Sequence, residues 1–181
     1  MNIFYLHNDP ETCARLHNNK HVVKMIIEYA QLMSTAHRVL DGHQNIETTD
    51  KGRKIKRWKH PNEYFDAGLM KATHAGHPSA IWTRQSKENY LWLNRMWQYL
   101  LLEYTYRYGK VHSCEKYKQY LYPWPENIPI DVGFTEPTPA MPDIYKVSGD
   151  SLQSYINYYN GAKRHIASWK KREIPDWYVN C

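Results

Sequence analysis

A row of polar side chains along an otherwise apolar segment is the part of this sequence best suited to chemistry. Its members follow one another at steps of three or four residues: His21, Lys24, Glu28, Gln31, Thr35 and Arg38. A carboxylate, an ammonium and an imidazole on one face of a buried helix are costly unless water or a partner satisfies them. Two interpretations stay open. The row is a solvated face with ordinary helix ion pairs, or it is the wall of a cleft.

In the cleft interpretation Glu28 is the catalytic residue, as a general acid, a general base or a stabiliser of a cation. His21 and Lys24 are then the neighbours that adjust its pKa. A second group of side chains would bind the substrate, because imidazole, guanidinium and indole groups suit an anionic or planar ligand. The predicted substrate-binding residues are His37, Arg38, His74, His77, Trp82 and Arg84.

Metal binding is the other chemistry open to histidine, and the pair His74 and His77 could chelate an ion. This spacing is unspecific, and neither a carboxylate nor a cysteine accompanies the pair. We therefore predict no metal and no cofactor.

A basic run lies further along the chain, where six of the ten residues from Lys51 to His60 are Lys or Arg. The run is either a solvated loop or a surface that contacts phosphates, with its tryptophan free to stack on a base or to wedge between bases. The predicted nucleic-acid-binding residues are Lys51, Arg53, Lys54, Lys56, Arg57, Trp58 and Lys59.

Composition limits the class of protein. The 181 residues suit one domain, residues 1–181, with one core. Twenty-four Lys and Arg against 18 Asp and Glu give a net charge of +6 and a pI near 9.1, which favours a polyanionic partner such as DNA. Three cysteines without CxxC spacing indicate neither a disulfide framework nor a zinc ribbon, so a reducing compartment is expected.

The chain has no apolar run near the roughly 20 residues that span a bilayer, and its first residues are interrupted too early for a signal peptide. We expect no membrane association and a cytoplasmic protein, in the host cytoplasm if it is viral. The oligomeric state cannot be predicted from the sequence.

The elements that must position these residues are mostly helices, so the expected fold is mostly α, one compact helical domain with a small basic hairpin or loop and a long Pro-rich loop. Asp9 and Pro10 begin the first helix, and Ser86 and Gly109 bound the clearest one. The expected helices are 11–40, 62–74, 79–84, 86–109, 114–122 and 151–172, the expected loop or hairpin is 43–60, and the expected Pro-rich loop or lid is 123–149.

Several strings between Cys13 and Gly109 carry a resemblance. These are KHVVKMIIEYAQLMSTAHRVLDG, KATHAGHP, WTR, NYLWL and, continuing just past Gly109, EYTYRYGKVH. With them the chain resembles a family of uncharacterised proteins common in tailed-phage genomes, which implies a phage origin and no particular function.

A more distant similarity is to the pyrimidine-dimer DNA glycosylases of the phage T4 endonuclease V type, which are small, basic and helical. In that family a histidine precedes the catalytic glutamate by seven residues, as His21 precedes Glu28 here. The resemblance implies a DNA-acting scaffold with Glu28 at its centre. The family's nucleophile is an N-terminal amine next to a small residue. Here Asn2 is larger and the first segment is longer, so this role of the amine is left open.

Three functions remain as hypotheses. The first is a phage-encoded enzyme that acts on a base or sugar of DNA, glycosylase-like or base-modifying, in which Trp58 or Trp82 stabilises a flipped nucleotide. The second is a non-catalytic binder of nucleic acid or of a host protein. The third is an enzyme on a free nucleotide or another small phosphorylated substrate. The target base, the product and the strand preference are beyond the sequence.

Overall fold

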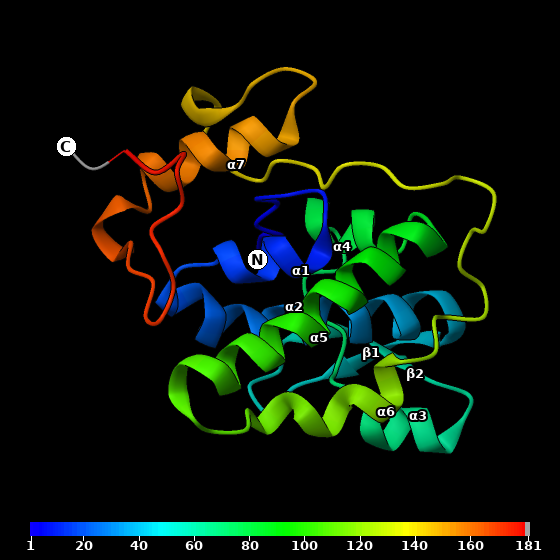
Figure 1. Ribbon diagram of the computed structural model, residues 1–181. Helices are drawn as coiled ribbons and strands as arrows, with labels where there is room; N and C mark the ends of the chain where they lie inside the picture. Colours follow the sequence, from blue (N-terminus) through cyan, green and yellow to red (C-terminus); the bar gives the residue numbers. More distant parts are fainter. Residues whose placement is uncertain (180–181) are drawn as a thin grey trace.

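Two long helices form the centre of the computed structural model, which describes residues 1–179. Helix α2 (Asn19–Asp41) packs against α5 (Lys87–Tyr108), and the extended segment 3–6 is buried with them. The chain is mostly helical, as predicted, and the sheet in the described part has two strands. Around the central pair lie shorter elements (Figure 1). They are α1 (Pro10–Leu16), β1 (His43–Thr48), β2 (Lys54–Lys59), α3 (Glu63–Gly68), α4 (Pro78–Thr83), α6 (Lys118–Leu121) and α7 (Ser151–Asn160), with the short 3-10 helices η1 (Ser113–Tyr117), η2 (Asp143–Tyr145) and η3 (Arg164–Ile166).

Elements with local start and stop signals agree with the prediction. The Ser86 side chain accepts a hydrogen bond from the Asn89 amide and begins α5, and Gly109 ends that helix in the left-handed conformation at φ 66°. Asp9 caps α1 in the same way, through the Thr12 amide. The basic run forms the second strand of an antiparallel hairpin, in which Gln44 pairs with Trp58.

The first helix, expected as one element over 11–40, is two helices. Its course breaks at His17, and the Asn18 side chain caps α2 by accepting from the His21 amide at 2.9 Å. The carbonyls at the end of α1 are taken by distant donors. Arg107 binds the carbonyl of His17 at 2.9 Å, and the Trp169 indole binds that of Leu16 at 2.9 Å. These contacts satisfy the groups that a continuous helix would otherwise use.

Three other predicted helices have the wrong ends. The helix expected over 62–74 stops at Gly68, because Arg38 takes the next carbonyls, those of Leu69 and Met70. The segment 114–122 is divided between η1 and α6. The helix expected to reach residue 172 ends at Asn160, whose side chain contacts the carbonyl of Trp177 at 3.0 Å instead.

A hydrogen-bonded chain inside the core fixes the first segment. The amide of Phe4 donates to the Tyr29 hydroxyl at 3.1 Å, which donates to Nε2 of His17 at 2.9 Å, while Nδ1 of His17 donates to the carbonyl of Cys13 at 2.8 Å. Burial lowers the pKa of His17 to about 4, so this ring is neutral near pH 7. The N-terminal segment is thereby held along α2.

Residues 123–142 form no helix or strand, and in Figure 1 the segment, drawn in yellow, runs around the outside from α6 to α7. Hydrogen bonds hold it along its length. The Pro129 carbonyl accepts from the Lys87 amide at 2.8 Å, and Thr135 bonds to Asn89 and to the Trp82 indole. The segment is therefore fastened to the end of α4 and to the start of α5.

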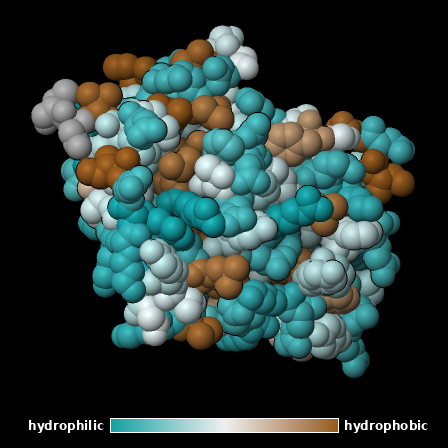
Figure 2. Space-filling view, in the orientation of Figure 1, coloured by the Kyte–Doolittle hydropathy of each residue, from teal (hydrophilic) through white to brown (hydrophobic). Residues whose placement is uncertain are grey.

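The surface in Figure 2 is largely hydrophilic, with apolar side chains scattered in small groups. None of the helices in residues 1–179 has the length and hydropathy needed to cross a bilayer.

The buried histidines predict acid sensitivity. Burial lowers the pKa of His17 to about 4 and that of His21 to about 2, from 6.5. Between these values and pH 6.5 the unfolded chain binds more protons than the folded one, so the free energy of unfolding falls as pH is lowered below 6.5. Each ring is expected to cost about 2 kcal/mol at pH 5. Urea unfolding at pH 7 and pH 5 measures the loss, and equal stabilities at both values would contradict it.

Candidate functional site

Glu28 lies in the first half of α2 between two cationic groups. One carboxylate oxygen is 3.2 Å from Nζ of Lys24, and the other is 3.9 Å from the amino group of Met1. The Glu28 side chain is 16% exposed, whereas that of Lys24 is 72% exposed. The core hydrogen bond from Phe4 to Tyr29 brings the amino group here, because it holds the first segment along α2. Glu28 and the Met1 amino group form a partly buried carboxylate–amine arrangement.

Two histidines predicted for substrate binding lie on the segment before α4. His77 caps this helix, since its Nδ1 accepts from the Ser79 amide at 3.1 Å. The pKa of His77 is lowered first by burial and then by the positive charges of the Met1 amino group and His74, while Glu28 opposes the shift. Glu28, the amino group and His74 therefore all lie close enough to act on the charge of His77.

Thr35, near the end of the polar row, faces this segment. The Thr73 amide donates to Oγ1 of Thr35 at 3.2 Å, and the Thr35 hydroxyl lies 3.4 Å from the Thr73 carbonyl. His74 follows with a positive φ of 50°, and its Nδ1 lies 2.7 Å from the Thr73 hydroxyl. The segment that carries the two histidines is therefore attached directly to α2.

A groove connects the histidine segment with the hairpin. It has a volume of about 660 Å³ and contains most of the basic run on one side and His74 on the other. Arg84 lies at its edge and is half-buried, and its Nη1 donates to the Ala80 carbonyl at 2.8 Å. The lining residues are Val39, Arg53, Lys54, Ile55, Lys56, Arg57, Trp58, Ala72, Thr73, His74, Ala75, Gly76 and Arg84.

Trp58 is the aromatic side chain best placed to meet a ligand in this groove. It is half-buried and also borders a second hollow, of about 240 Å³, shared with Lys59, Lys71 and Asn45. In the basic run, Lys51, Lys54 and Lys56 are exposed. Arg57, by contrast, lies 3.6 Å from the carboxylate of Glu47 on the neighbouring strand.

Other predicted site residues lie elsewhere. His21 is 5% exposed, contacts the Tyr159 hydroxyl at 2.6 Å and stacks on Phe4. Its ring therefore bonds to Tyr159 and not to Glu28. Trp82 is 1% exposed and its indole donates to the Thr135 carbonyl. Both side chains belong to the core.

Arg38 is also buried, at 5% exposure. It donates to the carboxylate of Asp66 at 2.7 Å and to the carbonyls of Trp58, Leu69 and Met70. Its contacts are thus structural ones, to the base of the hairpin and the end of α3.

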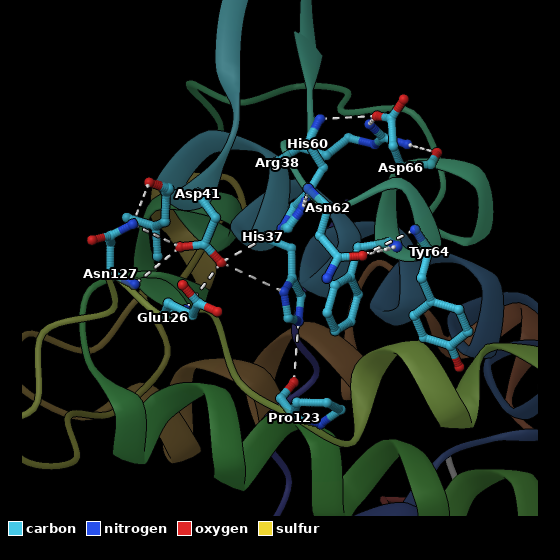
Figure 3. Close-up of polar contacts among 12 residues, drawn as sticks. His37, Arg38, Asp41, His60, Asn62, Tyr64, Asp66, Pro123, Glu126 and Asn127 are labelled. Carbon is cyan, nitrogen blue, oxygen red and sulfur yellow. Dashed lines mark hydrogen bonds and ion pairs between the residues drawn. The ribbon is translucent and has the colours of Figure 1, made fainter.

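His37 lies in a separate cluster at the end of α2, with Asp41 and His60 (Figure 3). This is the group of side chains in residues 1–179 that could hold a metal ion. Asp41 and His60 were not among the residues predicted from the sequence, and the role of the Met1 amine was left open. The four-residue step from His37 to Asp41 on one helix was the available signal.

Thr35 and its neighbour offer a matched test of how the histidine segment is held. Thr35→Val removes the hydrogen bond to the Thr73 amide and is expected to lower the free energy of unfolding by about 1–2 kcal/mol. Ser34→Ala is the control, because the buried Ser34 hydroxyl has no hydrogen-bond partner among the described residues. Urea unfolding should show the control to be neutral or stabilising, and equal losses in both variants would refute the attachment.

Comparison with known proteins identifies no relative of this chain, since no family model, no curated protein and no solved structure matches it.

Proposed function

We propose that the protein is a DNA-acting enzyme, glycosylase-like or base-modifying, in which Glu28 serves the reaction centre and the basic hairpin holds the DNA. The observation that carries the proposal is the groove that leads from the hairpin to His74. The charge of His74 acts on His77, and so do the charges of Glu28 and the Met1 amine. Glu28 is not among the residues that line this groove, so the proposal has a polyanion on the cationic groove and one nucleotide displaced past its His74 end toward the carboxylate.

The hairpin would supply the phosphate contacts. Its exposed lysines extend from the body of the protein, where they can follow a backbone without strain in the core. Trp58 would take the stacking role, because it borders the groove, whereas the alternative Trp82 is enclosed in the core. Arg84 and His74 would meet the displaced nucleotide at the other wall.

Glu28 would stabilise the positive charge that develops on a sugar when the bond to its base breaks. Its carboxylate is close to an amine. Attack by that amine, after it loses a proton, on C1′ of the sugar would break the bond to the base, which leaves with a proton, and opening of the sugar ring at the C1′–O4′ bond would then give a covalent Schiff base. Attack by water would release the base without a covalent link. Reduction with borohydride separates the two routes, because it traps the covalent species alone.

A non-catalytic nucleic-acid binder is the second candidate. It is favoured by the lining of the groove, which includes the basic run but not Glu28. Such a protein would need the hairpin and would tolerate changes at Glu28.

The phosphate contacts can be tested on the hairpin. Lys54→Ala with Lys56→Ala is expected to weaken binding to a DNA duplex and to reduce the slope of log affinity against log salt by about 2, since each of the two lysines that no longer meets a phosphate accounts for about one unit. Lys20→Ala with Lys110→Ala is the control, because it removes the same charge from exposed positions away from the hairpin. Fluorescence anisotropy at several salt concentrations gives both slopes. Equal slopes for the two double variants would exclude the hairpin as the binding surface.

Glu28→Gln tests catalysis. The change preserves shape and removes the charge, so DNA affinity should stay within about twofold while turnover falls by about 100-fold or more. Oligonucleotides that carry a thymine dimer, uracil or an abasic site serve as substrates for base release. For base modification, phage DNA is incubated with the protein and digested, and its nucleosides are measured by mass spectrometry. Lys20→Ala is the control for effects of purification and assay that are not specific to Glu28. Turnover in the Gln variant equal to that of the wild type would exclude Glu28 as the catalytic residue, and absence of turnover in the wild-type protein would favour the binder.

A further inference from the structure

Three side chains from distant parts of the chain meet at the base of the hairpin. His37 and Asp41 lie one turn apart in the last turns of α2, and His60 follows β2. Oδ2 of Asp41 is 3.9 Å from Nδ1 of His37 and 3.8 Å from Nε2 of His60, and the three atoms lie within 4.8 Å of one another. Figure 3 shows both rings directed at the carboxylate.

Gly42 permits this approach. A side chain at this position would come within 2.4 Å of the Arg38 carbonyl and 3.0 Å of the Lys59 carbonyl. The chain can therefore turn tightly out of α2, and the returning strand brings His60 against the helix end.

The hydrogen bonds of His37 leave a lone pair facing the carboxylate. Its Nε2 lies 3.1 Å from the Pro123 carbonyl, which only accepts, so the proton of the neutral ring is on Nε2. The Tyr90 hydroxyl, 2.9 Å from the same nitrogen, donates its own proton to the Leu121 carbonyl. A bare nitrogen thus faces a carboxylate oxygen, an arrangement that a cation between them would stabilise.

Asp41 is a buried carboxylate held by amides. Its side chain is 6% exposed, and it accepts hydrogen bonds from the backbone amides of Glu126 and Asn127 and from the Asn127 side chain, at 2.9–3.1 Å. These donors orient the carboxylate and are not cations. Its titratable neighbours at the cluster are the two imidazoles.

His60 contributes an independent observation. Its side chain is 7% exposed, and Nε2 has no hydrogen-bond partner among the described residues although it faces Asp41. A buried polar atom without a partner is costly. Its Nδ1 accepts from the Asn62 amide at 3.1 Å, so a ligand at Nε2 would move the ring proton to Nδ1 and break that contact.

We propose that His37, Asp41 and His60 bind one divalent transition-metal ion of the Zn²⁺ or Fe²⁺ type. Two imidazoles and one carboxylate form a donor set that these ions favour, and His37 and Asp41 have the outer contacts typical of metal ligands. Bonds of about 2.0–2.2 Å would draw the three atoms together by about 1 Å. The ion would tie the base of the hairpin to α2 and to the 123–127 segment. The proposed metal site is independent of catalysis at Glu28.

Metal binding is measured on the full-length chain after treatment with a chelator. Titration with Zn²⁺ by calorimetry is expected to show one saturable site, and Mg²⁺ should not compete for it. His60→Gln and Asp41→Asn should each weaken Zn²⁺ binding at least 100-fold. His112→Gln is the matched control, because Nδ1 of His112 accepts from the amide two residues later just as that of His60 does, outside the cluster. It should bind Zn²⁺ like the wild type.

A second measurement keeps the proposal testable if these variants fail to fold. In the wild-type protein, nuclear magnetic resonance should show Zn²⁺-dependent shifts of the His37 and His60 rings and of the Asn62 amide. Absence of saturable binding, wild-type affinity in both cluster variants, or unchanged signals of these three residues would overturn the proposal, and a buried water would then be the bridge between the side chains.

Discussion

The buried guanidinium of Arg107 sets the geometry at the start of the central helix. It is fully enclosed, and its donors go to Glu103, to the carbonyls of Arg15 and His17, and to the side chain of Asn19. A guanidinium taken out of water must have its donors satisfied, and here the helix junction supplies the acceptors. The chain consequently breaks between α1 and α2, and the first segment can lie along α2 with its amine near Glu28. Glu103 also binds Arg172, so the same cluster fastens the later part of the chain.

A second buried arginine acts at the other end of α2. Arg38 holds Asp66 and the carbonyls that follow α3, and it also binds the Trp58 carbonyl on the hairpin. Arg107 thus ties the start of the central helix to α1 and α5, and Arg38 ties its end to the hairpin and to the segment after α3. Between the two ties, Thr35 binds the histidine segment. Two of these contacts, Arg38 with the Trp58 carbonyl and Thr35 with the Thr73 amide, hold the two walls of the groove to the same helix.

The limits of sequence-based prediction follow from where each signal lies. The ends of α5 and the start of α1 were predicted, because Ser86, Gly109 and Asp9 act on residues a few positions away. The ends of the helices around Arg107 and Arg38 were not, since their carbonyls are taken by side chains remote in sequence. The same holds at the candidate site. The contact of Lys24 with Glu28 follows from helical spacing, whereas the partner of His21 is Tyr159, 138 positions away. No periodic pattern indicates such a pairing.

The hairpin has almost no core of its own. Every residue of β1 is exposed, and β2 has exposed and half-buried positions. The contact of Arg38 with the hairpin is at the Trp58 carbonyl, near the end of β2. Replacing a side chain toward the tip therefore removes little buried surface, and exposed substitutions of this kind change the free energy of unfolding by only about 0.5 kcal/mol. Evolution can thus alter the charge and shape of this arm, and with them the choice of partner, while the helical body remains unchanged.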